Sequence, residues 1–290
     1  MSVSDRFTTF LSNISLTVDQ KTRGAERKDA VVKALNAHYW GSTSNTANST
    51  YVGSWGKFTR MRPPRDVDVL FTLPASVYNR FQLRSGNKQS QLLQEVKNVL
   101  SNTFDRTAIR GDGPVVIVPF TAYSVEVIPA FSATAGGHLV CFTDGGGHYE
   151  RADYAAEAAS IKNSNDTTKN TRDLVRMMKR WQGYCSVPIK SFYLELLAVE
   201  FLGSWAHRGK SATWYDYMVR DFLEFMIGKA DGYLFAPGTY ALLALGSGWK
   251  SKAESALARA KKACDYEPSY AGLAGDEWQK IFGTDIPRNP

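Results

Sequence analysis

The stretch VGSWGKFTRMRPPRDVDVLFTLP, residues 52–74, decides the fold, because a Gly-Ser turn precedes an Asp-x-Asp on a predicted strand. Successive residues of a strand point to opposite faces, so Asp66 and Asp68 project together while Val67 and Val69 face the core. Two neighbouring carboxylates cannot both stay ionised without a cost in free energy. A bound divalent cation removes that cost, and oxygen ligands of this kind suit Mg²⁺ or Mn²⁺.

A third acid, Glu126, lies in the apolar run of residues 123–128, where an acid is costly unless it has a function. Three carboxylates on neighbouring strands can hold two metal ions roughly 3.5–4 Å apart. Gly53 and Ser54 are predicted to bind the donor phosphates, because glycine lets backbone amides approach a phosphate and serine adds a hydroxyl donor. The spacing of the neighbouring glycines excludes a Walker A loop.

The order of predicted elements divides the chain into two lobes. Residues 1–150 combine helices with short strands, which predicts a mixed α/β catalytic lobe, whereas residues 151–290 carry helical periods only. The boundary is therefore expected near residue 150, and the N-terminal helix is long enough to span both lobes. The expected strands are 67–73, 115–120 and 123–128, and the expected helices are 25–38, 90–104, 169–183, 190–204, 214–228 and 249–264.

Composition limits the class of protein. The chain has 290 residues, of which 43% are hydrophobic and 22% charged, as in ordinary globular proteins. Its net charge of +7 favours polyanionic partners such as nucleotides. Three widely spaced cysteines predict neither a disulfide framework nor a zinc finger. The N-terminus lacks the apolar core of a signal peptide, and no stretch is long enough to cross a membrane, so the protein is expected in the cytoplasm.

The ordered set of motifs resembles the cGAS/DncV-like nucleotidyltransferases, the CD-NTases of SMODS type from bacterial anti-phage CBASS systems, within the DNA polymerase beta-like superfamily. The resemblance spans nearly the whole chain and rests on G-S, D-V-D-V, V-E-V-I-P-A-F, L-V-R-M-M-K-R-W and I-K-S-F-Y-L-E-L-L. It implies an α+β fold: a polymerase beta-like nucleotidyltransferase core with a mixed sheet, packed against a C-terminal helical lobe. The last two motifs favour this subfamily over poly(A) polymerases and CCA-adding enzymes.

The resemblance also assigns roles to residues. Asp66, Asp68 and Glu126 match the catalytic metal ligands, and Gly53 and Ser54 match the turn on the donor phosphates. In the helical lobe, Lys179 and Ser191 match positions that reach the triphosphate, and Phe192 matches an aromatic position that stacks on a base. The helical spacing independently places Arg172, Arg176 and Lys179 on one basic face.

The implied activity is the joining of ribonucleoside triphosphates, GTP and/or ATP, into a cyclic oligonucleotide second messenger with release of pyrophosphate. A guanine-containing cyclic dinucleotide is the expected product; a cyclic trinucleotide fits the motifs equally well. The product would reach a separate effector by diffusion, with neither a membrane nor a nucleic acid required. Relatives commonly carry aspartate where this chain has Glu126, which leaves open a weakened sensing module, and the shared core leaves open nucleotide addition to an RNA end or small molecule.

Overall fold

The computed structural model describes residues 3–289, which form two compact units. One unit runs from Leu16 to Ala158. The other consists of the residues up to Ser15 together with those from Ala159 onward. The helix α6 (Tyr154–Thr168) contains the point of division. Each unit has its own core and is described separately.

The first unit contains a seven-stranded mixed sheet with the strand order β1-β2-β5-β4-β3, and β6 and β7 continue from β5. Only the β2–β5 pair is parallel; the other pairs within the sheet are antiparallel. The first part of β5 pairs with β4 and its last part with β6. The strands are β1 (Ser49–Tyr51), β2 (Asp66–Thr72), β3 (Arg110–Asp112), β4 (Val115–Pro119), β5 (Ser124–Ser132), β6 (His138–Phe142) and β7 (His148–Ala152).

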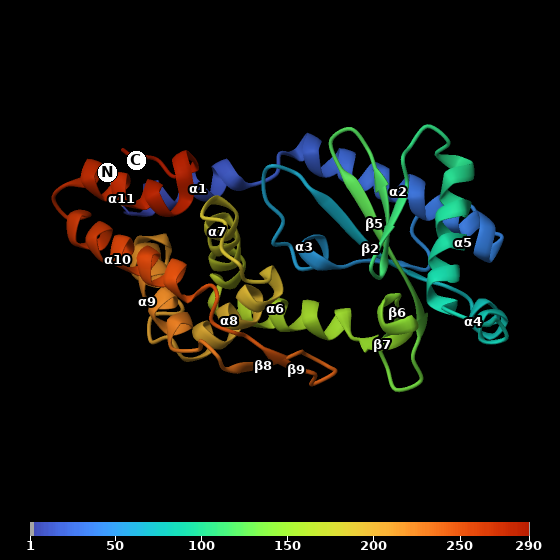
Figure 1. Ribbon diagram of the computed structural model, residues 1–290. Helices are drawn as coiled ribbons and strands as arrows, with labels where there is room; N and C mark the ends of the chain where they lie inside the picture. The colour runs from blue at the N-terminus through green and yellow to red at the C-terminus, as the bar shows by residue number, and fades with distance from the viewer. Residues whose placement is uncertain (1–2, 290) are drawn as a thin grey trace. The chain divides into compact units, whose positions relative to one another are not determined.

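Helices α2 and α5 cover one face of this sheet (Figure 1). Alternate valines of β2 and β5 point into the core beneath them. The helix α2 begins with a capping box, in which the side chains of Thr17 and Gln20 each accept a hydrogen bond from the other's backbone amide. It ends at Gly41, whose φ of 60° suits a left-handed helix cap. The helices of this unit are α2 (Val18–Trp40), α3 (Gly53–Gly56), α4 (Ala75–Gln82) and α5 (Lys88–Thr103), with a 3₁₀ turn at Asp144–Gly146.

The second unit is a helical bundle with one small β-hairpin. Its core is built from apolar side chains that include the fully buried Trp181, Trp249 and Trp278. The elements are α1 (Val3–Ile14), α7 (Thr171–Tyr184), α8 (Ser191–Ser204), α9 (Tyr215–Ile227), α10 (Lys250–Tyr266), α11 (Ala271–Phe282), the strands β8 (Tyr233–Phe235) and β9 (Leu242–Ala244), and 3₁₀ turns at Ala212–Trp214 and Gly283–Asp285.

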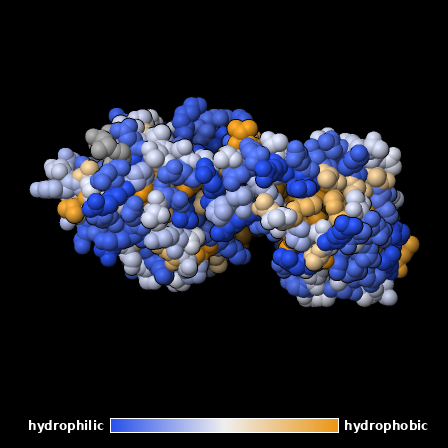
Figure 2. All heavy atoms as spheres, turned by 90° about the horizontal axis from the view of Figure 1, so that it is seen from above, coloured by the Kyte–Doolittle hydropathy of each residue, from blue (hydrophilic) through white to orange (hydrophobic). Residues whose placement is uncertain are grey.

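The mixed sheet and the C-terminal helices confirm the α+β fold class. The expectation that strands are absent after residue 150 is wrong at β8–β9. Residues 232–249 contain no charged side chain and are apolar throughout much of their length, so neither strand alternation nor helical period stands out. Among the described residues no helix is long and apolar enough to cross a membrane. Figure 2 shows mainly hydrophilic residues on the face it presents.

Arg6 ties the first helix of the helical unit to the last residues that the structure describes. Its side chain is fully buried, and its Nε lies 2.8 Å from a carboxylate oxygen of Glu267. Its remaining nitrogens donate to the main-chain carbonyls of Ala271, Pro287 and Arg288. A buried guanidinium is stable only when its charge and its donors are matched in this way.

We expect Arg6→Met to destabilise the protein by about 3–5 kcal/mol, because the change leaves the buried carboxylate of Glu267 without its cation. Urea unfolding measures the loss. The matched control is Lys162→Met, which removes one partner of an exposed pair with Asp166 and should change stability little. Equal stability of the two variants would contradict the role assigned to Arg6.

Candidate active site

The parallel β2–β5 pair brings the three predicted catalytic acids together. Asp68 is directly opposite Glu126 in the register, and Asp66 is opposite Ser124. These residues therefore share one face of the sheet, while the alternate residues Val67 and Val125 are fully buried on the helix-covered face. The next pair along the acidic face, Leu70 and Ile128, is apolar and buried, so the acids lie at the border of a small hydrophobic cluster.

The ionisation of Glu126 reflects this crowding. Burial raises the pKa of its carboxyl to about 7, and the negative charges of Asp66, Asp68 and Asp112 contribute to the increase. The positive charge of Arg110, in the edge strand β3, opposes it. Glu126 therefore carries an electrostatic cost from the neighbouring carboxylates, which adds to the cost of its burial.

The turn that carries Gly53 and Ser54 lies directly against Asp68. A Cβ atom added to Gly53 would come within 2.1 Å of Oδ2 of Asp68, and Gly53 has a φ of +52°. The amide of Val52 donates to the carbonyl of Asp68 over 3.1 Å. The sheet therefore positions the turn and the acids as one structure, with glycine required at the contact.

Trp55 is a further member of this site, and none of the sequence motifs indicated it. Its indole Nε1 donates to the carbonyl of Asp66 over 3.1 Å, and its ring stacks on Tyr51. Gly24 of α2 leaves room for it, since an added Cβ there would lie 2.5 Å from the indole. A glycine inside a predicted helix is a signal of such a close approach and could have revealed the contact.

The neighbouring basic residue Lys57 is held by an acid. Its ammonium lies 2.7 Å from Oε2 of Glu157 in α6, and both side chains are largely buried. Tyr154, one turn before Glu157, has a pKa raised by burial and by the charges of Glu157 and Asp68. The acidic face is therefore bordered by this tyrosine and by a lysine whose charge is balanced.

The remaining predicted residues belong to the helical unit. Lys179 of α7 forms a buried ion pair with Glu195 of α8 at 2.5 Å. The Ser191 hydroxyl donates to Oε1 of Gln182 at 2.7 Å, and Phe192 in the first turn of α8 is partly exposed. The expected basic face of α7 is thus largely charge-balanced, because Arg176 also pairs with Asp173.

The acidic face offers oxygen donors for a metal ion. As the side chains stand, residues 3–289 contain no ready group of three or more histidine, cysteine, aspartate or glutamate side chains that could hold one. The donor chemistry nevertheless fits Mg²⁺ or Mn²⁺, because Asp66, Asp68 and Glu126 offer carboxylate oxygens from adjacent positions on one face. Their mutual repulsion, visible in the raised pKa of Glu126, is the property that a cation would relieve.

The mixed sheet and the C-terminal helices have the fold of the CdnC and DncV nucleotidyltransferases. Two solved structures are similar to the chain along most of its length. Escherichia coli MS115-1 CdnC, solved with ATP, is 17% identical, with 98% of each chain covered and a TM-score of 0.67. Vibrio cholerae DncV, a cyclic AMP-GMP synthase solved with nonhydrolyzable GTP, is 13% identical, with 95% of this chain and 93% of that chain covered and a TM-score of 0.72.

A family model then identifies the chain more closely. Residues 1–165 match the Second Messenger Oligonucleotide or Dinucleotide Synthetase domain, SMODS, and this match covers more than half of the sequence. The chain belongs to this family and is therefore an enzyme that synthesises oligonucleotide or dinucleotide second messengers. The predicted resemblance is confirmed. A CdnC complex with HORMA-deltaN is also similar, at 16% identity, 97% coverage of each chain and a TM-score of 0.69. Comparison with curated proteins finds no match.

The contact between Gly53 and Asp68 allows a matched pair of variants. Gly53→Ala and Gly41→Ala both place a side chain at a positive φ, of 52° and 60°, but an added Cβ meets nothing within 4 Å at Gly41. Both variants should lose about 1–2 kcal/mol of stability from backbone strain. We expect Gly53→Ala to lose at least 100-fold in product formation as well, while Gly41→Ala keeps near wild-type activity. Comparable activities would contradict the proposed contact.

The raised pKa of Glu126 predicts a pH dependence of stability in the presence of a chelator. Between about pH 4.5 and pH 7 the folded state keeps a proton that the unfolded state has released, so ionisation of Glu126 lowers stability as the pH rises through this window. We expect Glu126→Gln to be about as stable as wild type at pH 4.5 and more stable at pH 8 in thermal unfolding.

The matched control is Glu26→Gln on the exposed side of α2. Its difference from wild type should stay nearly constant over the same range. A difference between Glu126→Gln and wild type that does not change with pH would show that the crowded carboxylates are not coupled.

Proposed function

We propose that this enzyme joins two ribonucleoside triphosphates into a guanine-containing cyclic dinucleotide with release of pyrophosphate, in anti-phage defence. The observation that carries the proposal is the row of acids on one face of β2 and β5, with the Gly53 turn against Asp68. The same reaction occurs twice in this scheme. A ribose hydroxyl of one nucleotide attacks the α-phosphorus of the other, and the bond to the departing pyrophosphate breaks.

Each proposed site residue of the sheet unit has a defined task in this scheme. Asp66, Asp68 and Glu126 hold two Mg²⁺ or Mn²⁺ ions. When bound, such ions lower the pKa of the attacking hydroxyl and neutralise charge on the triphosphate. Gly53 and Ser54 bind the donor phosphates through backbone amides and the serine hydroxyl. Trp55 keeps this turn in place through its hydrogen bond to the carbonyl of Asp66.

The helical unit is proposed to contribute the other nucleotide contacts. Lys179 and Ser191 reach the triphosphate, and Phe192 stacks on a base. The ion pair with Glu195 orients the ammonium of Lys179 and limits its net charge. This lysine would therefore act mainly by directed hydrogen bonds, since an ammonium carries three donors.

The identity of the bases is the most specific part of the proposal. A DncV structure is described with the linear intermediate pppA(3′,5′)pG, which supports guanine in the product here. The CdnC structure contains ATP, which supports adenine as the other base. GTP and ATP are therefore the expected substrates. The product is proposed to act on a separate effector, which needs no contact with this chain.

The proposal is tested by incubating the purified chain with all four ribonucleoside triphosphates and Mg²⁺ or Mn²⁺. Remaining triphosphates are removed with phosphatase, and the resistant products are identified by mass spectrometry. We expect a cyclic dinucleotide mass that contains guanine. Asp66→Asn/Asp68→Asn should reduce its amount at least 1,000-fold, because both carboxylates are needed.

Other outcomes separate the competing functions. A cyclic product without guanine would refute the base assignment and keep the reaction. Labelled nucleotide attached to added RNA would instead support an end-adding enzyme. Binding of nucleotide with no product under either metal, and with activity restored by Glu126→Asp, would support the weakened sensing module.

A further inference from the structure

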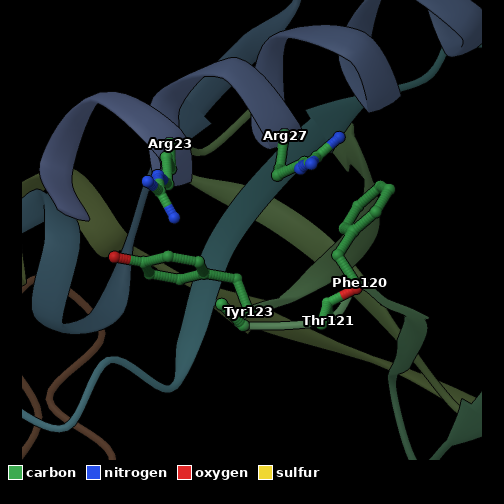
Figure 3. Close-up of a pocket in the computed structure, with 6 residues that line it drawn as sticks. Arg23, Arg27, Phe120, Thr121 and Tyr123 are labelled. Atoms are coloured by element: carbon green, nitrogen blue, oxygen red, sulfur yellow. The ribbon is translucent and has the colours of Figure 1, made fainter. Parts of the chain in front are cut away.

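A small cavity of about 140 Å³ lies on the helix-covered side of the sheet unit, between α2 and the turn that joins β4 to β5 (Figure 3). Arg23 and Arg27 of α2 form one side of it. Phe120, Thr121, Ala122 and Tyr123 of the turn form the other. None of these residues is among those proposed to act in nucleotide transfer.

The two arginines place their positive charges at the border of this mostly apolar cavity. They are one helical turn apart and extend from α2 towards the turn (Figure 3). Arg27 places its guanidinium 5.1 Å from the centre of the Phe120 ring. Arg23 pairs with Asp19 at 3.1 Å, but both side chains are more than 60% exposed. Exposed pairs contribute little to stability, so an anionic ligand can compete for Arg23.

The aromatic side is fixed before any ligand binds. The Tyr123 side chain is buried, and its hydroxyl donates to the main-chain carbonyl of Gln20 in α2. The amide of Phe120 donates to the carbonyl of Tyr123 over 2.7 Å, which closes the turn between them. A planar group that enters the cavity therefore meets walls whose position is already set, which reduces the entropy lost on binding.

We propose that this cavity binds one aromatic or heteroaromatic ring that carries a carboxylate or a phosphate. Its volume is close to that of an apolar cavity known to accept benzene, about 150 Å³, so a single ring fits. Phe120 and Tyr123 contact the faces or edges of the ring. The guanidinium groups of Arg23 and Arg27 bind the acidic group, because their planar donors match carboxylate and phosphate oxygens.

The cavity is separate from the acidic face but mechanically connected to it. Tyr123 and Glu126 lie on opposite faces of the same strand region, because their positions differ by an odd number. A Cβ added to Gly24 would lie 3.4 Å from the Tyr123 ring and 2.5 Å from Trp55, which shows how closely both rings approach α2. A ligand that holds α2 against the turn therefore also holds the helix on which Trp55 packs, and changes the binding of the donor nucleotide.

Binding is measured on the full chain without nucleotides, by saturation-transfer NMR titration with benzoate and phenyl phosphate. Benzyl alcohol supplies the ring without the charge, and acetate supplies the charge without the ring. We expect at least one ring anion to bind at least tenfold more tightly than either of these. Comparison of benzoate with phenyl phosphate identifies the preferred acidic group.

The site is located with a matched pair of double variants. Arg23→Gln/Arg27→Gln should weaken the ring anion at least tenfold. Lys21→Gln/Lys33→Gln removes the same charge from exposed positions of α2 that do not line the cavity, and should leave the affinity unchanged. Equal weakening in both variants, no weakening in the arginine variant, or no detectable binding of either ring anion would overturn the proposed site.

The connection to the donor turn is tested separately, with the product assay in place. A saturating ring anion should change the KM for the triphosphates at least twofold in wild type and not in Arg23→Gln/Arg27→Gln. An unchanged KM despite measured binding would overturn the connection and leave the site. Because binding is measured without turnover, a failure of the proposed reaction is distinguishable from a failure of this site.

Discussion

The row of carboxylates on β2 and β5 is the constraint on which the rest of the sheet unit depends. Asp68 and Glu126 are register partners, so the pairing of β2 with β5 holds their carboxyl groups at adjacent positions on one face of the sheet. This arrangement is unfavourable by itself, as the raised pKa of Glu126 shows. It persists because the alternate residues of both strands, such as Val67 and Val125, are buried under α2 and α5. A slip of one residue would exchange the two sets and bury the acids, so the core sets the site.

The same strand also fixes the turn that is proposed to bind phosphate. The carbonyls of Asp66 and Asp68 accept hydrogen bonds from Trp55 and Val52, while the side chains of the two aspartates face the acidic side. One strand thus positions both halves of the proposed site through its main chain and its side chains. The absence of a side chain at Gly53 lets the two halves approach closely. The packing of β2 in the core therefore helps to set the distance between the donor turn and the acids.

Many of the strands and helices could be predicted from the sequence, because their apolar residues recur with the short spacing of a strand or a helix. The strands around Val67 and Val125 and the helices from α7 to α10 follow alternation or helical spacing, and the structure places them within a few residues of the expected bounds. The length of β5 could not be read in this way. It continues past Pro129, which lies in the parallel pairing with β2 opposite Phe71, although proline usually ends such an assignment. The roles of the individual site residues remain predictions.

Long-range pairing of charges was the least readable feature. Helical spacing places Asp173 and Arg176 within one turn of α7, but it does not reveal that Glu195 of α8 balances Lys179. Glu195 lies in an apolar run and is almost fully buried, which is itself a sign that a cation must be near. The net charge of the chain is therefore a poor guide to where an anion binds. A lysine with a fixed acidic partner is held in one orientation, and orientation rather than excess charge is what recognition of a triphosphate by Lys179 would require.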